Sequence, residues 1–451
     1  MPDTHAAADP RDLLADLIAR ARAKGADTAD AVLFEGTSLS LSQRLGKPER
    51  LERSEGRDLG LRVFVGRRQA VVSTTDQRPA LLEAMVERAV AMARAVPEDP
   101  FCGIADPDAI ATGPTPDLDA EDPVEPAAEA LIERAKAAEA AALAVAGVTN
   151  SEGAEAGWSR SAVWMAASNG FVGGYAATRH SVSVSVIAGA GTAMEVDYDF
   201  DTTVHGADLD DPEALGRRAG ERAVRALNPR RVPTTKVPVI LDPRVSRGLL
   251  SSFAGAVNAA SIARGVSFLK DRMGQRVFAP GITIVDDPFL ARGLRSKPFD
   301  GEGVRPRRRA VIEDGVLTTW FVDLRAGRQL GIPTTGHASR GTGGPPSPAP
   351  TNLWLEPGPR SPEAMIRDVG TGFYVTKLLG HGANVVTGDY SRGAAGFWIE
   401  NGEIAYPVAE LTIAGNLKDM FATLEPASDL RIRFGMDAPT VLLQGMTVAG
   451  S

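Results

Sequence analysis

Three Asn-Gly or Asp-Gly pairs with strand-like residues on both sides constrain the fold more than any other feature of this 451-residue sequence. These pairs are Asn169-Gly170, Asp314-Gly315 and Asn401-Gly402. An Asn or Asp followed by Gly accepts positive φ at little cost and is a strong hairpin signal, and we expect type I′ turns at the last two. Because tight hairpins join antiparallel strands, the sequence predicts antiparallel rather than parallel sheets.

Helix and strand signals alternate along the first half of the chain. Apolar residues at helical spacing predict amphipathic helices, and period-two alternation predicts half-buried strands. The predicted helices are residues 11–24, 79–96, 127–146 and 212–227, and the predicted strands are residues 31–34, 38–43, 59–65, 69–73, 161–167, 171–179, 181–187 and 194–201. Residues 97–126 are rich in Pro and Asp and predict a surface loop before the third helix.

A domain boundary is predicted near residue 230, where Asn228-Pro229 and two arginines end the fourth helix. A strand at 237–241 and a helix at 247–264 follow, and then further hairpins and a Gly/Pro-rich loop at 341–350. We therefore expect an α+β protein. Residues 1–230 would form an N-terminal α/β domain with antiparallel hairpins, and residues 231–451 a β-rich C-terminal domain.

Composition narrows the class of protein. The hydrophobic share of 43% and the charged share of 24% are typical of a globular chain with a sizeable core. The net charge of −8 disfavours nucleic-acid binding, because a DNA backbone would be repelled on average. Residues 1–17 lack the apolar stretch of a secretory signal, and no segment reaches the roughly 20 apolar residues that cross a bilayer. We expect a cytoplasmic protein that binds neither nucleic acid nor membrane.

The histidines and the one cysteine show no metal-binding motif. The histidines are His5, His180, His205, His337 and His381. None of them is followed by Glu, and no two lie within one helical turn of each other. A catalytic zinc usually has three protein ligands with some clustering in sequence. The single cysteine, Cys102, excludes a disulfide and a Cys-rich zinc site. Only a site built from distant His and Asp residues remains open.

Two stretches could carry other chemistry. Glu195, Asp197, Asp199 and Asp201 occupy every second position, so a strand would place all four on one face. They could bind a hard cation, but we favour a solvated strand face that prevents edge-to-edge aggregation. No Gly-x-Ser-x-Gly elbow exists, and Cys102 has no nucleophile signature around it.

A run of arginines and a Gly-rich segment remain. Residues 305–309 (RPRRR) could contact phosphate or a carboxylate, and we favour a salt-bridged edge strand beside Asp300 and Glu302. Residues 380–393 are the most distinctive stretch, and their glycines permit close backbone approach. They match neither a Walker A loop nor a dinucleotide loop, so phosphate binding is poorly supported.

The same segment carries a resemblance to a known family. Residues 386–408 (VTGDYSRGAAGFWIENGEIAYPV) and 410–416 (ELTIAGN) closely resemble the C-terminal signature of the TldD/PmbA family, in its TldE (PmbA) branch. Residues 179–186 (RHSVSVSV) and 194–199 (MEVDYD) resemble its central segment, and residues 58–63 (DLGLRV) its N-terminal strand. The resemblance covers nearly the whole chain.

The resemblance implies a function. In this family TldD and TldE have similar folds and pair into a heterodimeric, zinc-dependent peptidase of the bacterial cytoplasm, which processes peptide precursors and degrades unfolded polypeptides. TldD holds zinc with H-E-x-x-x-H on a helix and a C-terminal Cys. When Arg264-Gly-Val-Ser267 is aligned with the TldD motif, the two His positions fall near Leu250 and Gly255 and the Glu position near Ser251.

None of these side chains ligates zinc, and the C-terminal Cys is missing, so we assign no catalytic, cofactor-binding or metal residue to this chain. We expect a non-catalytic subunit without a cofactor of its own, with zinc in a TldD-like partner and a peptide or unfolded polypeptide as substrate. One alternative is an independent non-zinc hydrolase that uses the acidic strand or His381 with Asp389. Another is a homodimeric peptide-binding protein. A DNA gyrase-associated regulator is disfavoured by the net charge.

Overall fold

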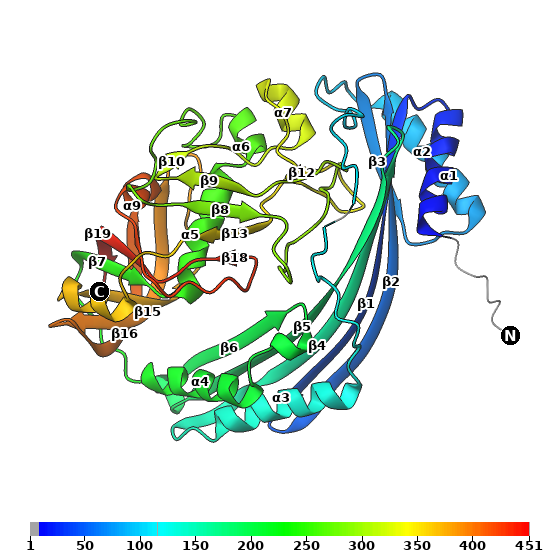
Figure 1. The fold of residues 1–451 in the computed structure, drawn as a ribbon. Helices are drawn as coiled ribbons and strands as arrows, with labels where there is room; N and C mark the ends of the chain where they lie inside the picture. The colour runs from blue at the N-terminus through cyan, green and yellow to red at the C-terminus, as the bar shows by residue number, and fades with distance from the viewer. Residues whose placement is uncertain (1–8, 115, 451) are drawn as a thin grey trace.

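The computed structural model describes residues 9–114 and 116–450, and it shows the α+β fold expected from the sequence. Two parts of the chain are built differently (Figure 1). The N-terminal half, here residues 9–230, is one long curved sheet with helices on its outer face. The C-terminal half, here residues 231–450, combines two sheets around one helix.

The N-terminal sheet is antiparallel and has the strand order β3-β2-β1-β4-β5-β6. Its strands are β1 (Thr28–Arg44), β2 (Lys47–Val65), β3 (Arg68–Thr74), β4 (Val148–Ala167), β5 (Val172–Ala188) and β6 (Glu195–Thr203). Two pairs of helices cover opposite ends of the convex face (Figure 1): α1 (Pro10–Ala23) with α2 (Pro79–Ala95), and α3 (Ala128–Leu143) with α4 (Pro212–Arg225). Short 3₁₀ turns lie at η1 (Gly191–Ala193) and η2 (Gly206–Asp208).

Alternation in β5 decides which face of the sheet is covered. Val182, Val184 and Val186 are buried beneath α3 and α4, whereas the intervening serines face the concave side. The two helices approach closely because α4 has glycine at the contact. A Cβ on Gly216 would lie 1.9 Å from the carbonyl oxygen of Ala138, so only glycine fits there.

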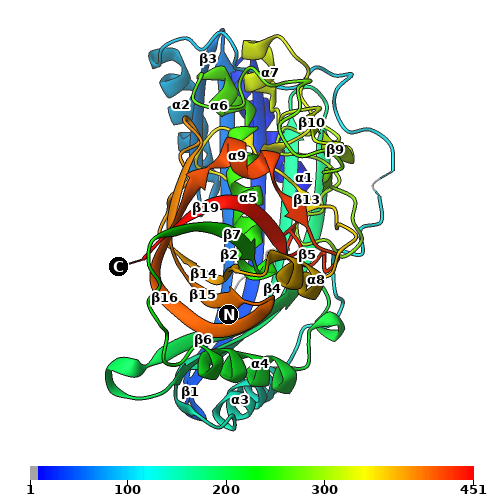
Figure 2. The ribbon, with the colours of Figure 1, turned by 90° about the vertical axis from the view of Figure 1, so that its left-hand side faces the viewer.

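The main sheet of the C-terminal half closes on itself. Its strands pair in the order β16-β15-β14-β7-β19-β17, and β16 also pairs with β19, so the strand ring closes (Figure 2). The strands are β7 (Thr235–Leu241), β14 (Gly372–Leu379), β15 (Asp389–Glu400), β16 (Glu403–Asn416), β17 (Glu425–Pro426) and β19 (Val441–Ala449). Most pairs are antiparallel, and β7 and β14 are parallel.

The second sheet of this half has the order β10-β9-β8-β13-β18. Its strands are β8 (Ile284–Asp287), β9 (Arg309–Glu313), β10 (Val316–Leu317), β13 (Asn352–Leu355) and β18 (Met436–Asp437), and β11 (Ala338–Ser339) pairs separately with β12 (Ser347–Pro348). Helix α5 (Pro243–Ala256) packs in one core cluster with both sheets. The remaining helices are short: α6 (Ala259–Ala263), α7 (Leu324–Leu330), α8 (Pro362–Val369) and α9 (Leu417–Ala422).

The predicted turns are confirmed. Asp314 and Gly315 have φ of 45° and 77°, and Asn401 and Gly402 have φ of 54° and 77°, as type I′ hairpins require. The hairpin at Asn169-Gly170 joins β4 to β5. Residues 97–126 form the predicted loop, which within the described residues contains no helix or strand beyond an isolated bridge.

Two predictions of local structure are wrong. The single helix expected at 247–264 is two helices, because the chain turns at Val257 and the Asn258 side chain caps α6 by accepting from the Ala260 N–H. The loop at 341–350 contains β12. Residues 47–58 were not predicted as a strand, since both faces of that part of β2 are exposed and polar.

The division into domains at residue 230 stays a prediction; that residue lies between α4 and β7. None of the helices within residues 9–114 and 116–450 is long and apolar enough to cross a membrane.

Candidate functional site between the two halves

The acidic residues of β6 lie on one face of the strand, as predicted, but that face is not solvated. Asp197, Asp199 and Asp201 are only 3%, 9% and 2% exposed, so the expectation of a solvated edge is wrong. They point to the side of the sheet that bears Val182, Val184 and Val186, their direct partners on β5. β6 is the edge strand of its sheet, and side chains from α4 and from the C-terminal half cover this face.

Arginine and lysine side chains from both halves surround this face. Asp197 lies 2.8 Å from Arg244 and 3.2 Å from Lys377, both in the C-terminal half. Asp201 accepts a hydrogen bond of 2.6 Å from Nε of Arg433. Asp199 pairs within the N-terminal half, with two arginines of α4: Arg218 at 2.7 Å and Arg222 at 3.0 Å. The acidic strand therefore joins the two halves electrostatically.

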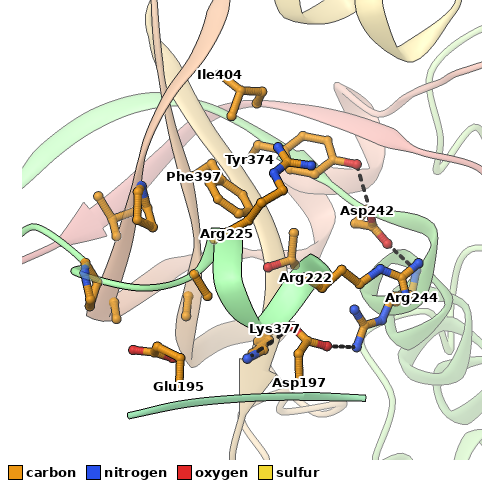
Figure 3. Close-up of a pocket in the computed structure, with 18 of the residues that line it drawn as sticks. Glu195, Asp197, Arg222, Arg225, Asp242, Arg244, Tyr374, Lys377, Phe397 and Ile404 are labelled. Atoms are coloured by element: carbon orange, nitrogen blue, oxygen red, sulfur yellow. Dashed lines mark hydrogen bonds and ion pairs between the residues drawn. The ribbon is translucent and has the colours of Figure 1, made fainter. Parts of the chain in front are cut away.

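Two adjoining cavities lie beside these ion pairs, one of about 250 Å³ and one of about 550 Å³. Figure 3 shows the smaller one between α4, β6 and the strand ring. The cavities share six lining residues, which are Arg222, Asp242, Arg244, Pro362, Glu363 and Tyr374. Together they form a groove along the contact between the halves.

A chain of hydrogen bonds crosses the groove. The Tyr374 hydroxyl donates to Oδ2 of Asp242 over 2.8 Å, and Oδ1 of Asp242 accepts from the backbone N–H of Arg244 over 2.9 Å at the start of α5. The Arg244 side chain then donates to Asp197 (Figure 3). Burial, and then the Asp242 carboxylate, raise the pKa of Tyr374, so its phenol stays protonated. This arrangement orients groups rather than supplying a base.

The helix positions that the family resemblance aligns with zinc ligands carry no suitable donor. Leu250 is buried in the core with α5's other apolar residues, and Ser251 is exposed. A Cβ on Gly255 would contact Val385 at 3.7 Å. In residues 9–114 and 116–450, no three His, Cys, Asp or Glu side chains group as a metal site would require. The side chains at these aligned positions therefore supply no zinc ligand.

The histidines make structural contacts at separate places in the fold. Nε2 of His180 lies 3.1 Å from Asp122, and Nε2 of His205 lies 3.0 Å from Asp119, which ties the predicted loop to β5 and to the segment after β6. Burial lowers the pKa of His180. His337 is fully buried between Asp286 and Thr335. His5 lies outside the described residues.

The pair proposed for a hydrolase, His381 and Asp389, is not supported. Within the described chain no hydrogen bond or ion pair joins them; Asp389 accepts from the Thr387 hydroxyl over 2.7 Å and from Asn416 over 3.1 Å. His381 is exposed. Cys102 is half-buried, and burial raises the pKa of its thiol, which disfavours the thiolate nucleophile.

The prediction that the arginine run forms a salt-bridged edge strand is confirmed only for one ion pair. Arg308 lies 3.4 Å from Asp287, but β9, which begins at Arg309, lies between β10 and β8 and is not an edge. Asp300 and Glu302 are buried and face away from the run: Asp300 accepts backbone N–H groups, and Glu302 accepts from Leu324 N. The Gly-rich segment does allow the close approach predicted from its glycines, because a Cβ on Gly382 would lie 1.6 Å from the Ser391 carbonyl oxygen.

Sequence reasoning did not find the groove. Its residues come from α4, β6, α5, α8 and three strands of the ring, and no local motif connects them. The one signal was the period-two acidic pattern of β6, which predicted a common face but not the arginines opposite it.

Comparison with known proteins gives consistent matches along the chain. Three family models match, described as PmbA/TldA metallopeptidase domain 1 (residues 29–93), central domain (121–227) and C-terminal domain (234–450). The chain is 40% identical to metalloprotease PmbA of Escherichia coli O157:H7, over 94% of this chain and 92% of that protein. It is 37% identical to a metalloprotease PmbA homolog of Haemophilus influenzae, over 95% and 93%.

Solved structures agree. A crystal structure titled as a putative modulator of DNA gyrase, from Bacteroides thetaiotaomicron, has a TM-score of 0.89 and 27% identity, and the match covers 98% of both chains. TldE from Thermococcus kodakarensis has a TM-score of 0.86 at 22% identity, covering 97% of this chain and 100% of that one, which shows the same fold.

Proposed function

Because the chain belongs to the PmbA/TldD metallopeptidase family, we propose that it acts as a non-catalytic subunit of a TldD–TldE-type peptidase complex. In this proposal a TldD-like partner holds the zinc ion and carries out hydrolysis in the cytoplasm. The present chain covers the partner's site and helps to admit peptides or unfolded polypeptides.

The residues of α5 at the aligned positions carry the proposal. Zinc hydrolysis needs imidazole, carboxylate or thiolate ligands and a general base in reach of the bound water. The aligned positions offer the buried Leu250, the hydroxyl of Ser251 and Gly255 without a side chain. The lack of a metal ligand and of a general base at these positions supports a non-catalytic role.

The test is reconstitution with a TldD-like protein from the same organism. We expect the purified chain alone to carry no stoichiometric zinc and to leave an unfolded substrate such as reduced casein intact. The mixture should form a complex that binds zinc and cleaves casein, and a chelator should stop the cleavage. Zinc is measured by mass spectrometry and complex formation by size-exclusion chromatography with light scattering.

The control is the same complex with the Glu of the partner's H-E-x-x-x-H motif changed to Gln, which should assemble but not cleave. Cleavage that persists in that complex, or cleavage by the present chain alone, would contradict the proposal. A stable homodimer that does not associate with the TldD-like protein would instead favour a peptide-binding homodimer.

A further inference from the structure

The smaller cavity of the groove has an irregular strand wall, and we call it the bulge-lined cavity. On β14 the pairing register shifts between Val375 and Lys377, which leaves Thr376 outside the ladder. Between β15 and β16 it shifts between Ala394 and Gly396, which leaves Ala395 unpaired with β16 and places Ala409 and Glu410 outside that ladder. Thr376, Ala395 and Ala409 line the cavity. Because a bulge frees backbone groups from the ladder, the wall offers main-chain donors and acceptors to an extended ligand.

The rest of the wall suits an apolar side chain. Carbon-rich groups from α8 and the strand ring face the cavity, namely Ile366, Phe397, Ile404, Pro407 and Val408. A volume of about 250 Å³ fits the end of a chain rather than a folded partner. Apolar walls with a few oriented polar groups are typical of pockets for small ligands and peptide ends.

One cation of the lining has no carboxylate of its own. Arg222, Arg244 and Lys377 each lie within 4 Å of an aspartate. Arg225, in the last turn of α4, makes no ion pair within the described residues. Its guanidinium lies over the Phe397 ring, 4.9 Å from the centroid (Figure 3). Stacking fixes the plane of the guanidinium and leaves its N–H edge available to a carboxylate.

The lining also has four carboxylates that could attract a peptide amine, namely Glu195, Asp197, Asp242 and Glu363. Asp197 is paired with Arg244 and Lys377, and Asp242 accepts hydrogen bonds from the Tyr374 hydroxyl and the Arg244 N–H. Glu195 is half-buried and has no ion pair within the described chain, but Lys377 is close enough to act on it electrostatically. A second cation at that corner would be repelled by Lys377, whereas an anion beside Arg225 meets an uncompensated charge. Next to Arg225, the local charge thus favours an anionic ligand group.

We propose that the bulge-lined cavity binds the carboxyl-terminal end of a peptide whose last side chain is apolar. The terminal carboxylate binds Arg225, the last side chain lies against Phe397 and Ile404, and the preceding backbone follows the bulged strands. This inference rests on the proposed function, because a peptidase complex meets and produces such chain ends. It assigns to the companion subunit a site for holding substrate or product.

The test uses fluorescence anisotropy with a decapeptide that ends in Leu and carries fluorescein at its amino terminus. The free acid should bind the isolated chain saturably, and the C-terminal amide of the same peptide should bind about tenfold more weakly or worse, because a charge-assisted hydrogen bond is lost. No partner and no zinc are needed. Failure of this test therefore leaves the subunit proposal standing, and failure of reconstitution would not change the measured peptide binding, so the two failures can be distinguished.

Two variants locate the site. Arg225→Gln should weaken binding of the free acid by about tenfold and abolish the preference for the free acid over the amide. Ile404→Trp should weaken binding of both peptides by filling the cavity, with the thermal midpoint measured to show that the fold persists. The matched control is Arg217→Gln: Arg217 is also an exposed arginine of α4 without an ion pair in the described part of the chain, but it does not line the cavity.

Three results would overturn the proposal: equal binding of acid and amide, wild-type binding by the Arg225→Gln variant, or no saturable binding of the free acid. Binding of a peptide labelled at its carboxyl end, with none of the amino-labelled peptide, would assign the cavity to the amino terminus instead and would also overturn it.

Discussion

Two of the charged contacts between the halves of the molecule are built in opposite ways. At the upper contact, Asp30 of β1 lies between Arg62 of β2 and Arg340, and all three side chains are at most 4% exposed. At the lower contact, Asp197 and Asp201 of β6 face Arg244 and Arg433, whose side chains are 14% and 25% exposed. The upper contact is closed to solvent, and the lower contact borders the groove.

This difference indicates that the upper contact is rigid and that the lower contact can bind a ligand. At the upper contact one carboxylate serves two guanidinium groups, and Nε and Nη2 of Arg340 have no hydrogen-bond partner within the described residues. Burial opposes ionisation of Asp30, but Arg340 and Arg62 outweigh it and hold its pKa low. At the lower contact the charges keep access to water and to a ligand. We therefore expect the upper contact to dominate stability.

The largest effect is expected from Asp30→Asn. Removing the charge leaves two buried guanidinium groups without a counter-ion, which typically costs about 3–5 kcal/mol. The control is Asp76→Asn, in an exposed pair with Arg78, which should change the free energy of unfolding by less than about 1 kcal/mol. Both are measured by urea denaturation. If the two variants lose similar stability, the upper contact is not the stronger one.

A smaller loss is expected from Asp201→Asn at the lower contact. Asp201 accepts from the Arg433 guanidinium and from the Asp210 N–H, and losing charge-assisted bonds of this kind costs about 1.5–3 kcal/mol. The matched control is Asp368→Asn, which breaks an exposed pair with Arg360. Added salt should reduce the effect of Asp201→Asn more than that of Asp30→Asn, because only the lower contact is open to screening. If added salt reduced the effects of the two substitutions equally, the two contacts would not differ in their exposure to solvent.

Gly60→Ala tests how tightly the halves approach at the upper contact. A Cβ on Gly60 would lie 2.7 Å from the backbone oxygen of Thr342, so the loop after β11 must move. Overpacking of this kind costs about 1–3 kcal/mol. Gly56→Ala on the same strand is the control, because its Cβ would meet nothing within 4 Å. A wild-type unfolding midpoint for Gly60→Ala would show that this contact is loose.

The smallest loss of stability is expected from Glu302→Gln near the upper contact, because this change breaks no ion pair among the described residues. Burial, and then Asp300, raise the pKa of Glu302 from 4.5 to about 8. The folded state thus keeps a proton that the unfolded state has lost, so wild-type stability falls as the pH rises from 4.5 through about 8. The uncharged Gln variant should lack this fall and become more stable than wild type in alkaline buffer.

Urea denaturation across that pH range measures the effect, with the exposed Glu155→Gln as control. Parallel pH profiles for Glu302→Gln and wild type would show that Glu302 is ionised in the folded protein.

Sequence patterns predicted those features whose causes are local. Positive φ at Asp314-Gly315 and Asn401-Gly402 follows from the residues themselves, and the stripe of Leu14, Leu17 and Ile18 specifies the buried side of α1. The α+β class and the family could be recognised in the same way. The break at Val257 was missed because small residues continue through it, and the nearest glycine, Gly255, lies inside α5 rather than after its end.

The candidate site could not be predicted, because its geometry depends on contacts distant in sequence. The aspartates of β6 meet Arg244 and Arg433, which are 47 and 232 positions away from their partners. Alternation shows that the acids share a face, but it does not show what covers it. Likewise, nothing around Arg225 indicates that Phe397 lies beneath its guanidinium.

The closure of the strand ring by β19 has a consequence for biosynthesis. Strand β7 needs residues 441–449 as its antiparallel neighbour, roughly two hundred positions further along the polypeptide. Until the ribosome has released that stretch, β7 and β16 present open hydrogen-bonding edges, which are prone to aggregation. The nascent C-terminal half is thus expected to depend on chaperones late in translation, whereas the curved sheet can be completed once β6 has emerged.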